Sequence, residues 1–101
     1  MHGKMNFDIK NNTLLRQFET RIDGKLIKIE YSEQPRKIFL TSFSIDDALD
    51  KNKYQEAFIL AIFDRLSDEN QKVFPTSPNI ASVFKKHREK YKHLLPIGIS
   101  L

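Results

Sequence analysis

The chain has 101 residues, of which 40% are hydrophobic and 30% are charged, and its formal net charge is +4. The length fits one domain, so we expect a single domain over residues 1–101. The absence of Cys excludes disulfides, thiolate zinc sites and Cys nucleophiles. No apolar run reaches the ~18 residues of a membrane span, and the first residues lack the apolar core of a signal peptide. These features predict a cytoplasmic protein outside the membrane.

The first half of the chain has the alternation of β-strands. Apolar or Thr side chains occupy every second position in residues 18–22, and residues 25–31 alternate again, with Ile27, Ile29 and Tyr31 on one face. Asp23-Gly24 between them is the signal of a type I′ hairpin, because both positions tolerate positive φ. Residues 7–10 could add a short strand.

A turn at residues 32–35 is expected to lead into a third clear strand over residues 37–45. Its alternation predicts one face formed by Phe39, Thr41, Phe43 and Ile45, and another formed by Ile38 and Leu40. Apolar side chains on both faces favour a strand inside the sheet rather than at its edge.

The second half is predicted to be helical around one short strand. Apolar residues follow the helical template from Tyr54 to Leu66, so a helix is expected from near Lys53 to Asp68, with Phe58, Ala61, Ile62 and Leu66 buried against the sheet. Three aspartates precede it, and any of them could cap it: Asp46, Asp47 and Asp50.

Residues 72–75 are short and apolar, and a proline closes them, which indicates a buried strand. Ser77-Pro78 then has the form of a helix start, with Ser as the N-cap. Helical spacing continues over residues 80–87, and residues 91–95 could form one more turn.

This order of elements predicts an α+β fold. The strands 37–45 and 72–74 are joined by a crossover helix, so they should be parallel neighbours. Such a pair places a crevice at its carboxyl ends. The N-terminus of the helix over 53–68 should face that crevice, where its N–H groups and dipole favour a phosphate.

Several segments resemble, in order and spacing, the minimal one-domain members of the GNAT acyltransferase superfamily, which bind acetyl-coenzyme A. The resemblance runs from Phe18 to Leu95. Its marks are Phe18-Glu19, Ile22-Asp23-Gly24-Lys25, Lys37-Ile38-Phe39-Leu40-Thr41, Gln71-Lys72-Val73-Phe74-Pro75, Ile80-Ala81-Ser82-Val83-Phe84 and His87-Arg88-Glu89-Lys90-Tyr91. It implies a twisted, mixed but mostly antiparallel sheet with a main crossover helix and a second, C-terminal helix.

The resemblance also implies an activity, the transfer of an acetyl group from acetyl-CoA to an amine. Backbone groups at the end of the third strand, at Phe43, Ser44 and Ile45, would orient the pantetheine arm. The family's R-G-x-G loop, whose glycines let N–H groups close on the pyrophosphate, corresponds here to Asp50-Lys51-Asn52-Lys53. This stretch has no Gly and one acidic residue, so Lys51, Asn52 and Lys53 would hold phosphate by charge with less defined geometry. The alternative interpretation is a solvated start of the helix.

Three residues are candidates for catalysis, each with a structural alternative. Ser77 stands where the family often has a Cys near the thioester, but it could simply cap the helix. His87 corresponds to the family's His and could act as a base, or it could stabilise a helix end. Tyr91 could protonate the leaving thiolate, or pack under the last turn. His2, His87 and His93 have no metal-ligand spacing with nearby carboxylates, so no metal site is predicted.

The net charge comes from one stretch, which we call the basic segment: Lys85, Lys86, Arg88, Lys90 and Lys92. It is either a solvated helix face or an anion site, and it lacks the interleaved aromatic residues of RNA-binding proteins. Three hypotheses remain open: a small N-acyltransferase, a relative that kept the fold as a binding module without catalysis, and the less favoured nucleic-acid binder. The amine acceptor and the oligomeric state cannot be read from the sequence.

Overall fold

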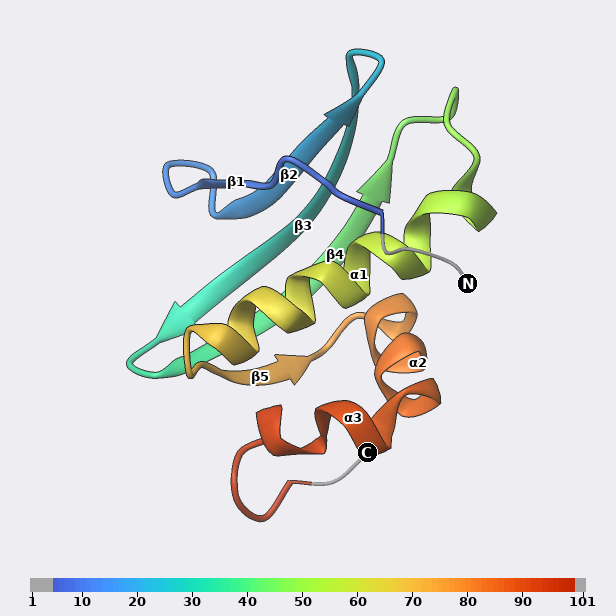
Figure 1. Cartoon of the computed structure of the whole chain (residues 1–101). Helices are drawn as coiled ribbons and strands as arrows, with labels where there is room; N and C mark the ends of the chain where they lie inside the picture. The colour runs from blue at the N-terminus through green and yellow to red at the C-terminus, as the bar shows by residue number, and fades with distance from the viewer. Residues whose placement is uncertain (1–4, 100–101) are drawn as a thin grey trace.

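The computed structural model describes residues 5–99, in which a five-stranded sheet packs against a long crossover helix (Figure 1). The elements in chain order are β1 (Lys10–Asn12), β2 (Gln17–Ile22), β3 (Lys25–Gln34), β4 (Lys37–Ile45), α1 (Lys51–Asp68), β5 (Lys72–Pro75), α2 (Pro78–Lys86), α3 (Arg88–Tyr91) and the 3-10 turn η1 (Lys92–Leu94). The helix and the four main strands that the sequence predicts are all present.

The strands lie in the sheet in their chain order, from β1 to β5. The first four form an antiparallel meander, and β5 pairs with β4 in parallel. Because α1 connects β4 to β5, the parallel pairing confirms the predicted crossover. The fold class is therefore α+β with a mixed, mostly antiparallel sheet, as predicted.

The sequence predicts the position of one turn between strands correctly and that of the next turn incorrectly. Asp23 and Gly24 both have positive φ, 52° and 77°, which confirms the predicted hairpin. The turn predicted at residues 32–35 is wrong in position, because β3 continues to Gln34 and the chain reverses at Pro35-Arg36. Arg36 has a φ of 61°, a left-handed conformation that its residue type does not signal.

The short strand predicted at residues 7–10 is also misplaced, since β1 spans Lys10–Asn12. The preceding residues pack on the core instead of pairing: the Phe7 ring lies edge-on to that of Phe58, with centroids 5.3 Å apart. Apolar residues next to an edge strand can thus pack into the core beneath the sheet instead of joining the strand. Their alternation in the sequence does not distinguish these two outcomes.

Helix α1 packs one apolar side on the sheet. Its buried residues are Phe58, Ile59, Ile62, Phe63 and Leu66. Ile62 is fully buried, which confirms the helix assignment, whereas Ala61 is only half-buried because the buried stripe is rotated toward Ile59 and Phe63. Its sheet partners in the core include Ile27, Ile29, Ile38 and Leu40.

A β-bulge in β4 changes which side chains share a face. Glu30 pairs with Ser42 and Tyr31 pairs with Leu40, so Thr41 is left without a partner. The extra residue shifts the alternation: beyond the bulge, Phe43 lies on the core side and contacts Phe58. The predicted common face of Phe39, Thr41, Phe43 and Ile45 is therefore wrong.

The C-terminal part closes the core beside α1. Helix α2 buries Ile80, Val83 and Phe84, and the Phe84 ring meets that of Phe63 on α1 at 5.6 Å. Its cap residues are Ser77 at the start and His87 at the end, as the sequence suggested. The turn predicted near residues 91–95 forms as α3 and η1.

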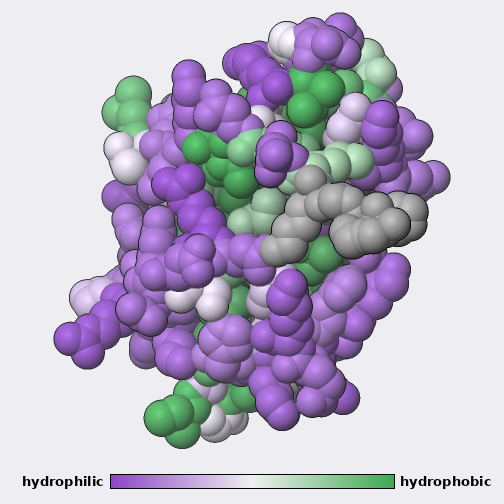
Figure 2. Space-filling view, in the orientation of Figure 1, coloured by the Kyte–Doolittle hydropathy of each residue, from purple (hydrophilic) through white to green (hydrophobic). Residues whose placement is uncertain are grey.

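The molecular surface in the view of Figure 2 is mostly hydrophilic, with small and separate hydrophobic areas. The most exposed large apolar side chains lie outside the helices and strands, at Leu14 and Leu15 and at Ile97. Within residues 5–99, no helix combines the length and the apolar character needed to cross a lipid bilayer.

Candidate functional site at the divergence of β4 and β5

The parallel strands β4 and β5 separate halfway along β4. Their pairing runs from Lys37–Lys72 to Leu40–Pro75, while β4 continues to Ile45. Within residues 5–99, no strand pairs with Thr41–Ile45 on the side away from β3. We call the space beside this unpaired edge, on the side of β4 away from β3, the β4 gap.

At the inner end of the gap, the backbone carbonyl of Leu40 holds the residues that follow β5. The backbone N–H groups of Thr76 and Ser77 donate to the Leu40 oxygen over 3.1 and 3.3 Å, and the Thr76 hydroxyl donates to it over 3.0 Å. These bonds end the parallel ladder and turn the chain from β5 into α2. A backbone edge that loses its partner strand in this way leaves N–H and C=O groups for another extended chain.

The predicted cofactor residues of β4 lie along this part of the strand. Phe43 is half-buried on the core side, and Ser44 is exposed opposite Lys28 of β3. Ile45 ends the strand opposite Ile27. A hollow of about 260 Å³ lies at this end of the sheet, lined by Leu26, Lys28, Ser44, Ile45 and Asp46.

The N-terminus of α1 is capped by its own sequence. The Asp50 carboxylate accepts hydrogen bonds from the backbone N–H groups of Asn52 at 3.0 Å and Lys53 at 3.4 Å. Of the three candidate caps, Asp50 is therefore the one used. Lys51, Asn52 and Lys53 are exposed in the first turn. The N–H groups that would meet a phosphate are thus already bound to a carboxylate.

Ser77 is the predicted catalytic residue that lies at the gap, since its N–H binds the Leu40 carbonyl. It is 6% exposed and is the N-cap residue of α2, but its hydroxyl makes no capping hydrogen bond. Ser77 therefore occupies the N-cap position that the structural alternative predicted, but its side chain does not cap the helix.

His87 is held by a carboxylate of α1. Its Nε2 lies 2.9 Å from a Glu56 oxygen, and the Lys86 ammonium lies 2.9 Å from the other oxygen of the same carboxylate. Lys86 first and His87 second lower the pKa of Glu56, so this carboxylate is ionised at neutral pH. Sequence reasoning missed Glu56, which is separated from His87 by 31 positions and carries no local signal.

Tyr91 is likewise bound to α1. Its hydroxyl donates to an Asp64 oxygen over 2.7 Å, and its ring packs on Phe63 with centroids 5.3 Å apart. Burial first, and the Asp64 carboxylate second, raise the pKa of Tyr91, so the hydroxyl keeps its proton. The side chain is 2% exposed, which agrees with packing under the last turn.

The three candidate catalytic residues therefore fall into two places. Ser77 is bound to β4, whereas His87 and Tyr91 are bound to side chains of α1. The basic segment adjoins His87 and lines an open hollow of about 340 Å³ between Lys85 and Lys90. Two of its lysines are paired, Lys86 with Glu56 and Lys92 with Glu89. Of the predicted histidines, His2 lies outside the described residues, and His93 bonds to the Ser67 hydroxyl.

A mixed sheet whose parallel strands diverge beside the start of a crossover helix defines a GNAT-type domain. The family model of GCN5-related N-acetyl-transferase matches residues 17–94, and the chain belongs to this family. The match covers β2 to η1, which includes the β4 gap, the start of α1 and all three candidate catalytic residues. No curated protein matches the chain.

Proposed function

We propose that the protein is a small N-acyltransferase that moves an acetyl group from acetyl-CoA to an amine. The observation that carries this proposal is the unpaired edge of β4 over Thr41–Ile45. A strand edge of this kind binds an extended chain through its free N–H and C=O groups, and the pantetheine arm, with its two amides, is such a chain. The family match supports the acyl-transfer class.

The two ends of coenzyme A fit the chain unequally. The pantetheine arm suits the β4 edge at Phe43, Ser44 and Ile45. The pyrophosphate does not suit the start of α1 as it stands, because the Asp50 carboxylate already accepts from its N–H groups. Lys51 and Lys53 can attract phosphate by charge alone. The β4 edge is therefore the main contact that this chain offers to the donor.

Acetyl-CoA would supply an acetyl thioester. The amine nitrogen would form a bond to the acyl carbon and lose a proton, while the carbon–sulfur bond breaks and the leaving thiolate takes up a proton. Ser77 lies at the inner end of the gap, but no base was found to activate its hydroxyl among the contacts of the described residues. We therefore propose direct attack by the amine. His87 and Tyr91 remain predictions as the proton acceptor and the proton donor.

The test compares two donors that share the arm and differ in the pyrophosphate. Acetyl-CoA and S-acetylpantetheine are titrated calorimetrically, and thiol release is followed with a set of amines. We expect both donors to bind with similar affinity, and the donor at about 100 times its dissociation constant to stabilise the fold by about 2.7 kcal/mol. Absence of binding by both donors would refute the proposal.

A second candidate function is that of a GNAT-fold binding module without catalysis. The self-capping of α1 by Asp50 favours it, because this contact occupies the position that the family uses for the pyrophosphate. Donor binding without thiol release for any amine would support this alternative.

A further inference from the structure

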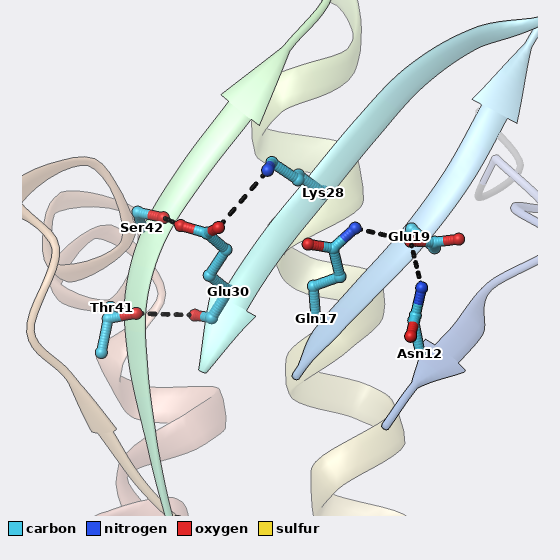
Figure 3. A network of polar contacts seen from close by, with 7 residues as sticks. All are labelled: Asn12, Gln17, Glu19, Lys28, Glu30, Thr41 and Ser42. Carbon is cyan, nitrogen blue, oxygen red and sulfur yellow. Dashed lines mark hydrogen bonds and ion pairs between the residues drawn. The ribbon is translucent and has the colours of Figure 1, made fainter. Parts of the chain in front are cut away.

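Polar side chains on the face of the sheet opposite α1 pair with one another, as Figure 3 shows. The Glu30 carboxylate accepts from the Ser42 hydroxyl at 2.6 Å and lies 3.3 Å from the Lys28 ammonium. Gln17, which is only 5% exposed, donates from its amide to the Glu19 carboxylate over 2.6 Å. Buried polar groups in proteins are almost always paired in this way, so an unpaired buried group calls for an explanation.

Gln55, in the second turn of α1, has such an unpaired group. Its side-chain oxygen is fully buried and accepts no hydrogen bond from residues 5–99. The buried Nε of Arg65 also lacks a hydrogen bond, but it lies 3.3 Å from the Glu69 carboxylate, which compensates it by charge. The Gln55 oxygen has no such compensation. It destabilises the fold, because it gives up its hydrogen bonds to water and gains none in return.

Helical geometry directs Gln55 toward the sheet. Ile59 and Ile62, four and seven positions later, are fully buried, so Gln55 extends the same buried stripe toward the start of α1. On one flank of the stripe, the Phe58 ring contacts that of Phe43 on the core side of β4. Because α1 runs back from the end of β4, Gln55 lies nearer than Phe58 to that end of the strand.

The other flank of the stripe faces α2. Glu56, the residue after Gln55, binds Lys86 and His87 at the end of that helix. Helix α2 follows β5 and packs against both β4 and β5, so it lies on the side of β4 away from β3. Gln55 is thus directed between the outer half of β4 and α2. It therefore faces the outer part of the β4 gap.

Two features that lack hydrogen-bond partners thus meet at the gap. One is the strand edge over Thr41–Ile45, and the other is the buried oxygen of Gln55. An extended chain that contains amides supplies N–H groups to both. We propose that Gln55 is a donor-binding residue, whose amide oxygen accepts a hydrogen bond from an N–H of the pantetheine arm. This inference rests on the proposed function, because it adds a contact to the same donor in the same gap.

Gln55 can make this contact without any movement of the helix. The residue as a whole is half-buried, so part of its side chain reaches the surface. The last torsion of a glutamine side chain is broad, and a modest turn of the amide brings the oxygen toward the gap. The bound arm then shields the hydrogen bond from water, which strengthens it. The donor thereby removes the destabilisation that the unpaired oxygen causes in the free protein.

The experiment measures stability and donor affinity in the same variant, Gln55→Leu. Leucine is close to glutamine in size and is equally favourable in a helix. Because the variant lacks the unpaired oxygen, the midpoint of its thermal unfolding should rise by about 5 °C in the free protein. Calorimetric titration with S-acetylpantetheine should show about fivefold weaker binding than in the wild type, because one neutral hydrogen bond to the donor is lost.

Two further variants make the result specific. Gln55→Glu keeps an acceptor oxygen on a side chain of the same length, so it should bind S-acetylpantetheine as tightly as the wild type does. Gln17→Leu is the matched control, because the same substitution removes a paired amide on β2, two strands away from β4. It should lower the midpoint of unfolding and leave the affinity for the donor unchanged.

Three results would overturn the proposal. A lower midpoint of unfolding in Gln55→Leu would show that the oxygen is paired in the free protein. Equal affinity of the wild type and Gln55→Leu for S-acetylpantetheine would show that the oxygen does not meet the arm. An equal loss of affinity in Gln55→Glu and Gln55→Leu would show that the shape of the side chain matters and its acceptor does not.

The outcome separates this contact from the proposed function. Donor binding that depends on Gln55, without acetyl transfer to any amine, would leave the contact standing and remove the acyltransferase. Acetyl transfer by Gln55→Leu with wild-type affinity for the donor would leave the acyltransferase standing and remove the contact. Absence of donor binding by the wild type would remove both.

Discussion

Replacement of Asp50 tests whether the chain blocks its own phosphate position. The Asp50 carboxylate binds the N–H groups of Asn52 and Lys53, where the family uses a glycine-rich loop. Asp50→Asn removes the charge and keeps a side chain that caps helices as well as Asp does. The free energy of unfolding should therefore change little, while the affinity for coenzyme A should rise.

The size of the gain follows from the charge. A carboxylate ~5 Å from one phosphate charge in water repels it by about 0.8 kcal/mol, which is about a fourfold change in the dissociation constant. Salt reduces this value, and a second phosphate charge increases it. Asp50→Arg combined with Lys51→Gly and Lys53→Gly should bind more tightly still, because glycine lets the backbone approach a phosphate.

The assay is a calorimetric titration of coenzyme A into the wild type and each variant, with a thermal melt of each free protein. Asp47→Asn is the matched control, since Asp47 is an exposed carboxylate of the same loop that is not the cap of α1. Equal gains in Asp50→Asn and Asp47→Asn would show that only net charge matters. Wild-type affinity equal to that of the triple variant would refute the argument about the loop and strengthen the enzyme interpretation.

Three further predictions concern stability and charge. Ile62→Asp should destabilise the fold by about 4 kcal/mol or more in urea unfolding, because it buries an unpaired charge at a fully buried position; an unchanged midpoint would contradict the packing of α1. The lowered pKa of Glu56, caused first by Lys86 and then by His87, adds stability that is present above about pH 4.5 and is lost as the pH falls through the folded-state pKa. Glu56→Gln should therefore be less stable than the wild type at pH 7, and the difference should shrink as the pH falls below about 4.5; a constant difference would contradict this assignment. Binding of nucleic acid to the basic segment should be weak and should fall steeply with salt, so a tight complex at physiological salt would promote the nucleic-acid hypothesis.

The elements that sequence reasoning placed well are those set by local signals. The Asp23-Gly24 hairpin needs only two residues that tolerate positive φ, and both have it. The apolar periodicity of α1 continues through four turns, so its existence was predictable, although the exact buried stripe was not. The parallel pairing of β4 and β5 followed from the crossover rule.

The misplaced features depend on tertiary context. The bulge at Thr41 has no signature in the residues around it, yet it moves Phe43 to the core side and brings Ser42 opposite Glu30. The contacts of His87 with Glu56 and of Tyr91 with Asp64 join residues 31 and 27 positions apart, so only the packing of α1 against α2 and α3 could reveal them.

The unequal edges of β4 have a consequence for amide hydrogen exchange. The strand is held by β3 along its whole length but by β5 only as far as Leu40. In the outer half of the strand, amides that point toward β3 exchange slowly, whereas those that point into the gap exchange with solvent at rates closer to those of a loop. One strand thus contains alternating protected and unprotected amides, and any extended chain that settles on its free edge would be detected there, residue by residue, as a slowing of exchange.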